Sequence, residues 1–501
     1  MSSLRMNKIV IDPITRLEGH GKIICILDEN RNCVKAYLQI PELRGFEKFL
    51  EGRAAEDAAV ITPRICGVCP TAHHMASTKA LDDLFHVEPP IAAKKIRELT
   101  YNIFMLEDHA LHVYVLGGPD LIVGPTAPKE ERNILGVLKK VGDLGVKIIK
   151  LRRRFRKLNE KIMGRVVHPP FGRPGGISKP LDPDVVKELR ELTDQGIELA
   201  VTTHKVFKGI IENSPEISKL ITDKAYRAET YYMGLVDDKN RLNFYDGKIR
   251  IVDPRGREFA KFDVHEYLDH IAEHIEPWTY IKFPYLKKVG WRGFIDGVDS
   301  GVLCVAPLAR LNVSDSLATP RAQEAFEDMI RFFGEKPVHY TLAMHWARVV
   351  EMIYAAERIK ELAEDPDIES KEVLNIPTAK PGPVGIGVVE APRGTLIHHY
   401  ESDENGILIK ANLLVATQFN VARINMSIDS AARAFIRGGE VKEGFLNLVE
   451  MAFRAYDPCF ACGTHAIPGG LNIVIEFYSE KGDYLGKKYI GDINLSCETD
   501  I

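Results

Sequence analysis

The sequence predicts an α+β protein, in which a central bundle of long helices and small peripheral β-sheets form one intertwined, helix-rich unit. Three observations favour this fold class. Long stretches of helical periodicity fill the middle of the chain, strand-like alternation is restricted to short segments, and two Cys-x-x-Cys pairs lie at opposite ends. If both pairs serve one site, the two ends must meet and the chain cannot divide into independent halves.

The first elements along the chain are expected to be strands. Apolar and polar residues alternate between residues 7 and 40, which predicts two strands joined by a turn at residues 28–32. Residues 43–60 are expected to be helical, with a break at Gly52. Helical periodicity then returns in five longer stretches, at residues 91–116, 133–163, 184–212, 320–364 and 426–454.

The segments between these helices carry turn signals and short strand patterns. Residues 168–181 form a loop rich in proline and glycine, and residues 225–312 show an irregular, strand-like pattern. Residues 383–418 are expected to hold two short strands around the motifs EAPRG and ESDENG. The tail, residues 466–501, contains two more strand-like runs, LNIVIEFY and YLGKKYI.

Composition and charge are those of an ordinary globular protein. The chain is 45% hydrophobic and 27% charged, and its net charge of −4 gives no reason to expect nucleic-acid binding. The basic stretch at residues 147–161 is interpreted as a solvated or partner-facing helix face. No apolar run is long enough for a secretory signal or a transmembrane helix, so we expect a cytoplasmic protein without a direct membrane span.

The cysteines carry the strongest chemical signal. Two pairs lie in RICGVCPTAHH and DPCFACGTH, and four thiolates are a usual ligand set for zinc or an iron–sulfur cluster. Zinc ribbons place their pairs about 15–20 residues apart, whereas Cys69 and Cys459 are separated by most of the chain. The spacing leaves three interpretations open: one deeply buried shared metal site, two separate uses, or a structural role. Thiolates suit nickel, iron or zinc better than magnesium.

Five segments together resemble the large subunit of the nickel–iron hydrogenases. They are DPITRLEGH (12–20), RGFEKFLEGR (44–53), RICGVCPTAHH (64–74), EAPRG (390–394) and DPCFACGTH (457–465). They occur in the family's order, span nearly the whole chain, and are most specific in the two cysteine motifs. The resemblance implies that Cys66, Cys69, Cys459 and Cys462 bind nickel, and that Cys69 and Cys462 also bridge to an iron with carbon monoxide and cyanide ligands.

The resemblance also implies roles for residues around the metals. Four residues would lie over or beside the open side of the metals: Asp108, Pro392, Arg393 and Asp457. Glu18 is the implied proton relay beside the terminal thiolate of Cys459, which fits the chemistry, because heterolytic cleavage of dihydrogen needs a Lewis-acidic metal and a base. A terminal thiolate can take the proton first, and a carboxylate within hydrogen-bond reach can then carry it away.

The remaining implied roles concern a second cation and the diatomic ligands. Glu47, His465 and a backbone carbonyl around Leu413 would hold magnesium or a similar cation, and His73 would hydrogen-bond near a bridging cysteine. Thr417 could donate to a cyanide from a segment that resembles a strand lining those ligands, although this chain has alanine where many members have proline before the Ser/Thr.

Each of these residues also has a plainer interpretation. Glu18 could cap a turn or pair with Arg16, Glu47 could be a surface helix residue, His73 a core histidine, and Asp108 an ion-pair member. No role is assigned to His74, His398 or His399.

Electrons released at such a centre need another carrier. The remaining cysteines, Cys25, Cys33, Cys304 and Cys497, lack cluster spacing and are expected to be buried free thiols. The stretch GPVGIGVVE is not a dinucleotide motif. We therefore expect the partner to be an iron–sulfur small subunit, with further electron-transfer subunits where needed.

The resemblance further implies that a maturation protease cuts the chain after the histidine of the second motif. Residues 1–465 would then be the hydrogenase unit, and residues 466–501 a removable extension. Two other function classes stay open. One is an energy-converting or sensory hydrogenase-like subunit, and the other is a zinc-stabilised structural subunit.

Overall fold

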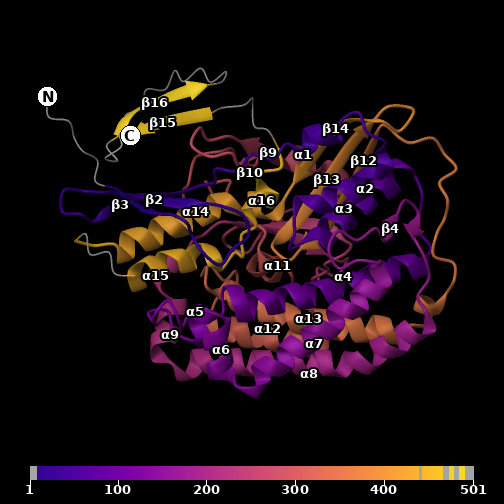
Figure 1. Cartoon of the computed structure of the whole chain (residues 1–501), viewed down its shortest axis with the longest axis horizontal. Helices are drawn as coiled ribbons and strands as arrows, with labels where there is room; N and C mark the ends of the chain where they lie inside the picture. The colour runs from indigo at the N-terminus through magenta and orange to yellow at the C-terminus, as the bar shows by residue number, and fades with distance from the viewer. Residues whose placement is uncertain (1–7, 439–442, 467–472, 479–483, 491–501) are drawn as a thin grey trace.

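The computed structural model describes residues 8–438, 443–466, 473–478 and 484–490. Long helices form one side of the molecule, small sheets lie around the other side, and α16 lies between them (Figure 1). The predicted α+β class, a helix bundle with small peripheral sheets, is confirmed. No helix among these residues has both the length and the apolar character needed to cross a membrane.

Four long helices make the bundle: α4 (Ile91–Leu111), α7 (Asp143–Met163), α8 (Pro183–Asn213) and α13 (Ala343–Glu364). Helix α13 packs against α4 and α8, and α7 packs against the same two helices. Helices α7 and α8 bury one apolar stripe each, whereas α13 is buried on almost every side. The core of the bundle therefore lies around α13, and α4 continues into a π-helix, η3 (His112–Leu116).

Two predicted helices are interrupted by glycine. Residues 133–163 form α6 (Ile134–Val141) and α7, separated by Gly142 with φ +57°. Residues 320–364 form α12 (Pro320–Phe333), which ends at the left-handed Gly334, and then α13. Glycine adopts these conformations without the steric cost that other residues have, so it ends each helix. The predictions of single helices here were wrong at these two points.

A second layer pairs α3 (Pro70–Leu84), which was not predicted, with a three-stranded sheet. The antiparallel strands are β12 (Val384–Ala391), β13 (Gly394–Ser402) and β14 (Leu408–Leu414), one more strand than expected. Helix α3 packs directly on β12. A Cβ atom on Gly385 or Gly387 would lie 2.3 Å from the Ala80 carbonyl oxygen or 2.2 Å from that of Ala76. The glycines of GPVGIGVVE thus permit close helix–strand packing.

The first forty residues form three strands rather than two: β1 (Lys8–Ile11), β2 (Lys22–Leu27) and β3 (Cys33–Gln39). Helix α14 (Ala416–Phe435) packs on β3, which brings the N-terminal sheet beside the second half of the chain. The helix expected from residue 426 thus begins ten residues earlier, and α15 (Glu443–Arg454) follows as a separate helix.

The other elements are short and connect these layers. Residues 43–60 give only α1 (Phe46–Leu50), η1 (Ala55–Asp57) and the start of α2 (Ala58–Ile61), followed by η2 (Thr62–Ile65). One further sheet consists of β6 (Tyr231–Val236), β7 (Lys248–Val252), β8 (Glu258–Phe262) and β11 (Leu303–Cys304). Another pairs β9 (Ile271–His274) with β10 (Phe283–Leu286). The expected runs of the tail pair antiparallel as β15 (Ile473–Tyr478) and β16 (Tyr484–Ile490).

Candidate metal centre

The two cysteine pairs meet in the interior of the fold. Cys66 and Cys69 lie between η2 and the first turn of α3, and Cys459 and Cys462 lie at and within α16 (Phe460–Gly463). The four sulfur atoms lie within 4.8 Å of one another, and all four residues are buried. Sulfur–sulfur distances are 3.4 Å for Cys66–Cys459 and 3.5 Å for Cys69–Cys462. This group of sulfurs, the sulfur cluster, has the donors that a soft metal prefers.

The charge of the sulfur cluster is partly offset without a metal. Burial opposes ionisation, yet hydrogen bonds from the three neighbouring thiols, together with the Arg393 guanidinium, hold the pKa of Cys66 well below its usual value. Burial and the neighbouring sulfurs raise the pKa of Cys459 and Cys462. Metal binding would therefore release protons from these thiols, because thiolate is the binding form.

A backbone contact and one arginine hold the two ends of the chain together. The Phe460 N–H donates to the Glu18 carbonyl at 3.0 Å, and Glu18 and Cys459 form an isolated parallel β-bridge. The Arg44 guanidinium donates to the carbonyl oxygens of Ile65 at 2.6 Å and Ala461 at 3.4 Å. Arg44 therefore links the segment before Cys66 to the helix that carries Cys462. Arg44 was not singled out from the sequence, although it begins the RGFEKF motif.

Glu18 lies beside the sulfur of Cys459. The thiol donates to its Oε2 at 2.9 Å, and the Ala461 N–H donates to the same oxygen at 3.2 Å. Burial and the charge of Cys66 raise the pKa of Glu18. Arg16 pairs with Asp120 at 2.5 Å instead. The Glu18 carboxylate is thus free to face the sulfur cluster.

Arg393 lies in the turn between β12 and β13 and binds two carboxylates. Its Nη2 is 2.8 Å from Asp457 Oδ2, and its Nη1 is 3.5 Å from Asp108 Oδ2. Burial raises the pKa of Asp108 to about 7. Burial also opposes ionisation of Asp457, but Arg393 and His112 outweigh it and hold its pKa well below the usual value. Arg393 therefore keeps a fixed positive charge beside an ionised Asp457.

A second buried arginine positions this turn. Arg310 donates to the carbonyl oxygens of Ala391 at 2.7 Å and Pro392 at 3.1 Å, and it also binds the carboxylates of Glu351 and Glu390. These contacts fix the backbone on either side of Pro392. Arg310 lies outside the sequence motifs, so only the folded structure reveals its role.

Thr417 lies in the first turn of α14, whereas the sequence predicted a strand here. Strand β14 ends at Leu414, and Thr417 follows the start of the helix. Its Oγ1 accepts the Cys459 N–H at 3.0 Å. The hydroxyl hydrogen of Thr417 then remains available to another acceptor. The helix start thus serves to orient the backbone of the second cysteine pair.

Glu47, Leu413 and His465 lie together at a second position. His465 Nε2 is 2.5 Å from the Leu413 carbonyl oxygen and 3.4 Å from Glu47 Oε1, and the Leu413 N–H donates to Glu47 at 2.7 Å. Burial opposes protonation of His465, but Glu47 outweighs it and raises its pKa. A carboxylate, a carbonyl and an imidazole nitrogen are donors that fit a divalent cation.

The histidines of the first motif differ in their surroundings. His74 uses both ring nitrogens inside the fold, with Nδ1 2.7 Å from the Ala59 carbonyl oxygen and Nε2 accepting the Gly172 N–H at 2.7 Å. His73 Nδ1 lies 3.2 Å from His398 Nε2, while His73 Nε2 is buried without a hydrogen-bond partner among the described residues. His74 is therefore structural, and His73 keeps one nitrogen free.

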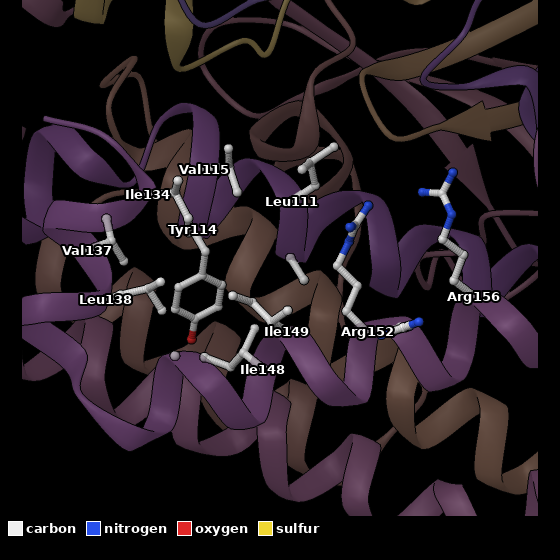
Figure 2. A pocket seen from close by; sticks show the side chains of 13 residues that line it. Leu111, Tyr114, Val115, Ile134, Val137, Leu138, Ile148, Ile149, Arg152 and Arg156 are labelled. Carbon is white, nitrogen blue, oxygen red and sulfur yellow. The ribbon is translucent and has the colours of Figure 1, made fainter.

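Two neighbouring cavities lie on the side of α4, and the smaller of them adjoins the centre. The smaller, about 110 Å³, is lined by Gly67, Val68 and Asp108 among others. The larger, about 370 Å³, lies between η3, α6 and α7, where Ile148 and Ile149 approach the Tyr114 ring (Figure 2). Leu111, Arg152 and Arg156 line both cavities. The smaller cavity therefore reaches Asp108, and the larger, mostly apolar one lies farther out along α4.

The other cysteines that the structure describes lie away from the sulfur cluster. Cys25, Cys33 and Cys304 are buried and form no disulfide, as predicted. Cys497 lies outside the described residues.

Known families and relatives match almost the whole chain. Residues 44–168 and 296–465, more than half of the chain, match the family described as Nickel-dependent hydrogenase, and residues 8–43 match one described as HoxL-like. The chain is 46% identical over 485 residues to an F420-non-reducing hydrogenase iron-sulfur subunit of Archaeoglobus profundus, covering 96% of this chain and 99% of that protein. It is 36% identical over 504 residues to the NAD-reducing hydrogenase HoxS subunit beta of Cupriavidus necator, covering 96% and 99%.

Solved structures share the fold. An NAD+-reducing [NiFe]-hydrogenase in the H2-reduced state superposes with a TM-score of 0.85 at 35% identity, over 92% of this chain and 99% of that chain. The Ni-Fe-Se hydrogenase from D. vulgaris Hildenborough, at 23% identity, has a TM-score of 0.71 over 92% of this chain and 100% of that chain. These matches agree with a buried four-cysteine group that suits nickel and iron. The chain belongs to the nickel-dependent hydrogenase family, as the large, metal-binding subunit of a [NiFe] hydrogenase.

Proposed function

We propose that this chain is the catalytic subunit for reversible heterolytic cleavage of dihydrogen, and that it passes the electrons to an iron–sulfur partner subunit. The observation that carries the proposal is the buried sulfur cluster, with the Glu18 carboxylate on the Cys459 thiol and the Arg393 guanidinium held beside it. This arrangement joins soft metal ligands, a proton acceptor and a fixed positive charge in one site.

All four cysteines would bind nickel, and Cys69 and Cys462, whose sulfurs are 3.5 Å apart, would also bridge to iron. When bound, the two metals supply the Lewis acidity and the redox capacity for cleaving dihydrogen. Carbon monoxide and cyanide would be the remaining ligands of the iron. The Thr417 oxygen accepts the Cys459 N–H, which leaves the hydroxyl hydrogen to donate to a cyanide.

Proton transfer is assigned to Cys459 and Glu18. The sulfur takes the proton, and the carboxylate receives it across the 2.9 Å contact. Glu18 is only partly buried, so the proton can continue outward from its carboxylate. Arg393 stays charged and positions Asp108 and Asp457 over the open side, while the smaller cavity beside α4 offers dihydrogen a place close to Asp108.

The convergent group of Glu47, the Leu413 carbonyl and His465 would hold magnesium or a similar cation. The support is its donor set and its place directly after Cys462, whose carbonyl oxygen lies 2.6 Å from His465 Nδ1. Such a cation would stabilise the position of α16, the helix that carries the second cysteine pair. It would also offset the negative charge of a new chain end at His465.

Partner subunits are expected to carry the electrons away. The metal-loaded chain alone should not reduce a viologen dye with hydrogen, because the sulfur cluster is buried and the described residues contain no second cysteine cluster. Adding the iron–sulfur subunit should restore dye reduction. The measurement is hydrogen-dependent dye absorbance, with and without the partner. Robust reduction by the isolated chain would contradict the need for a partner.

The acceptor is expected to depend on those partners. Full-length relatives of this chain are named both F420-non-reducing and NAD-reducing hydrogenases. Similar large subunits therefore occur in enzymes whose names differ in the acceptor, which supports an acceptor site outside this chain. We place the assembly in the cytoplasm.

A maturation protease is expected to remove residues 466–501 once nickel is bound. Cys462 lies three residues before His465, and Ala466 is buried, so an uncut tail leaves directly from the metal site. The match to the hydrogenase family also ends at residue 465. Intact-mass measurement of active enzyme should give a chain ending at His465. A full-length chain in nickel-loaded, active protein would show instead that the β15–β16 hairpin is permanent.

A further inference from the structure

One buried carboxylate, that of Asp120, lies between two arginines from distant parts of the chain. Asp120 lies in α5 (Pro119–Ile122) and is 1% exposed. Its Oδ1 is 2.5 Å from Arg16 Nη2, and its Oδ2 is 3.0 Å from Arg454 Nη1. Each oxygen of the carboxylate therefore binds one guanidinium, so that Asp120 connects the segment of residue 16 to the segment of residue 454.

These two segments are the ones that bring Glu18 and Cys459 together. Arg16 lies two residues before Glu18, and Arg454 lies five residues before Cys459. The backbones of Glu18 and Cys459 form the isolated parallel bridge, and the thiol lies 2.9 Å from the carboxylate. Asp120 thus joins the two segments just before they meet at the sulfur cluster.

Arg454 also holds the Glu18 segment directly. Its Nε donates to the Thr15 carbonyl oxygen at 3.1 Å, and its Nη2 donates to the Thr15 hydroxyl at 3.1 Å. The Thr15 hydroxyl in turn donates to Glu450 Oε2 at 3.1 Å. Burial lowers the pKa of Arg454 to about 10, which leaves the guanidinium charged near neutral pH. Arg454 is therefore a buried cation that fixes the backbone at residue 15.

The backbone at Arg16 requires such support. Its φ of +61° lies in the left-handed region, which residues other than glycine rarely adopt. A residue keeps this conformation only when its surroundings fix it. Arg16 Nη1 donates to the Leu116 carbonyl oxygen at 2.9 Å, and Nη2 donates to Asp120 and, at 3.3 Å, to Asn447 Oδ1. Losing these contacts would release the turn that leads directly into Glu18.

We propose that Asp120 is a positioning residue that holds the Glu18 carboxylate within hydrogen-bond distance of the Cys459 sulfur. It does so by binding Arg16 and Arg454 at the same time, and it acts through them rather than on the reacting atoms. The inference rests on the proposed function for the role of Glu18 as proton relay. A misplacement of about 1 Å can cost roughly 10²-fold in rate, so a small shift of this segment suffices for a large effect.

Asp120→Asn keeps the shape of the side chain but removes the charge that binds both arginines. In the purified holoenzyme, turnover should fall about 10–100-fold, the range for losing an outer partner at a metal site. Nickel content and the KM for dihydrogen should not change. Hydrogen exchange followed by mass spectrometry should be faster at residues 14–20 and 458–463 but unchanged in α8. Asp82→Asn is the matched control, because it removes a carboxylate from the buried Arg97 elsewhere in the fold.

A double-mutant cycle with Glu18→Gln separates positioning from general damage. If Asp120 acts through Glu18, Asp120→Asn should lower turnover much less in the Glu18→Gln background than in the parent. An equal loss in both backgrounds overturns the proposal. So does Asp120→Asn with the turnover and the exchange rates of the parent.

A second variant tests the same link if Asp120→Asn does not fold. Arg132 Nη1 lies 3.9 Å from Asp120 as a third guanidinium, so removing the charge can destabilise the fold. Arg16→Gln acts from the partly exposed side and leaves Asp120 paired with Arg454. It should give the faster exchange at residues 14–20 and the lower turnover, and Arg16→Lys, which keeps the charge, should recover part of both. Parent exchange in folded Arg16→Gln overturns the proposal.

Failure of the proposed relay would be visible separately. If Glu18→Gln alone turns over like the parent, the relay is wrong, whereas the exchange rates still decide whether Asp120 holds the segment. Parent exchange in folded Asp120→Asn, together with a strong effect of Glu18→Gln, would overturn the role of Asp120 and leave the relay intact.

Discussion

Cys459→Ser is expected to abolish both hydrogen turnover and nickel binding. The serine hydroxyl is a harder and far less acidic donor than a thiol, so it cannot replace a thiolate ligand to nickel. The same loss is expected for Ser at Cys66, Cys69 and Cys462, because the four sulfurs form one group within 4.8 Å. The loss in metal affinity should exceed the roughly 10–100-fold that losing an outer-shell partner costs. Metal analysis and hydrogen uptake measure both effects.

Cys33→Ser is the matched control for these variants. Its sulfur is buried away from the sulfur cluster and donates to the Lys35 carbonyl, which a serine hydroxyl can also do. This variant should keep nickel and iron in equal amounts. Near-normal nickel in Cys459→Ser would contradict the assignment, and zinc alone in the parent protein would favour the structural alternative.

Glu18→Gln is expected to leave the metals bound and to lower turnover by at least about 10²-fold, the low end for losing a positioned proton carrier. The amide keeps the shape of the side chain and can still accept the Ala461 N–H, but it cannot take up a proton from Cys459. The loss should fall on kcat, while metal content stays constant. Steady-state hydrogen uptake and metal analysis of the same preparation separate the two.

Glu18→Asp provides the comparison. It keeps an ionisable carboxyl group but retracts it by one methylene from the 2.9 Å contact with Cys459, so its activity should lie between those of the parent and of Glu18→Gln. If Glu18→Gln stays within a few-fold of the parent, protons leave the centre by another route and the relay is wrong.

Motifs predicted the sulfur cluster, but the packing around it was visible only in the fold. The two cysteine motifs carried enough information to expect one site, and the structure brings their sulfurs together. Arg310 and Arg44 each donate to carbonyl oxygens of segments that are distant in the sequence. No local pattern marks such contacts, because they arise only when α11 (Pro307–Val313), the turn between β12 and β13, and the cysteine segments pack together.

Two helices were missed or misplaced because the sequence lacks the usual signals for them. Helix α3 was not predicted, because it is buried on nearly all sides and so carries no apolar stripe. Helix α14 begins earlier than expected, since Val415 at its N-cap is not a residue that signals a helix start. Gly142 and Gly334, in contrast, are breaks that the sequence displays, and weighting them more heavily would have divided both helices correctly.

The link that Arg44 makes between the two ends bears on the order of synthesis. A growing chain presents Cys66 and Cys69 long before Cys459 and Cys462 exist. Until α16 docks against Arg44 and the Glu18 backbone, the pocket has half its ligands and one open wall. Metal that arrives in this interval meets only Cys66 and Cys69, two of the four ligands. The segment that carries Cys459 and Cys462 is therefore the last to join the metal site, and it completes the ligand set when it packs.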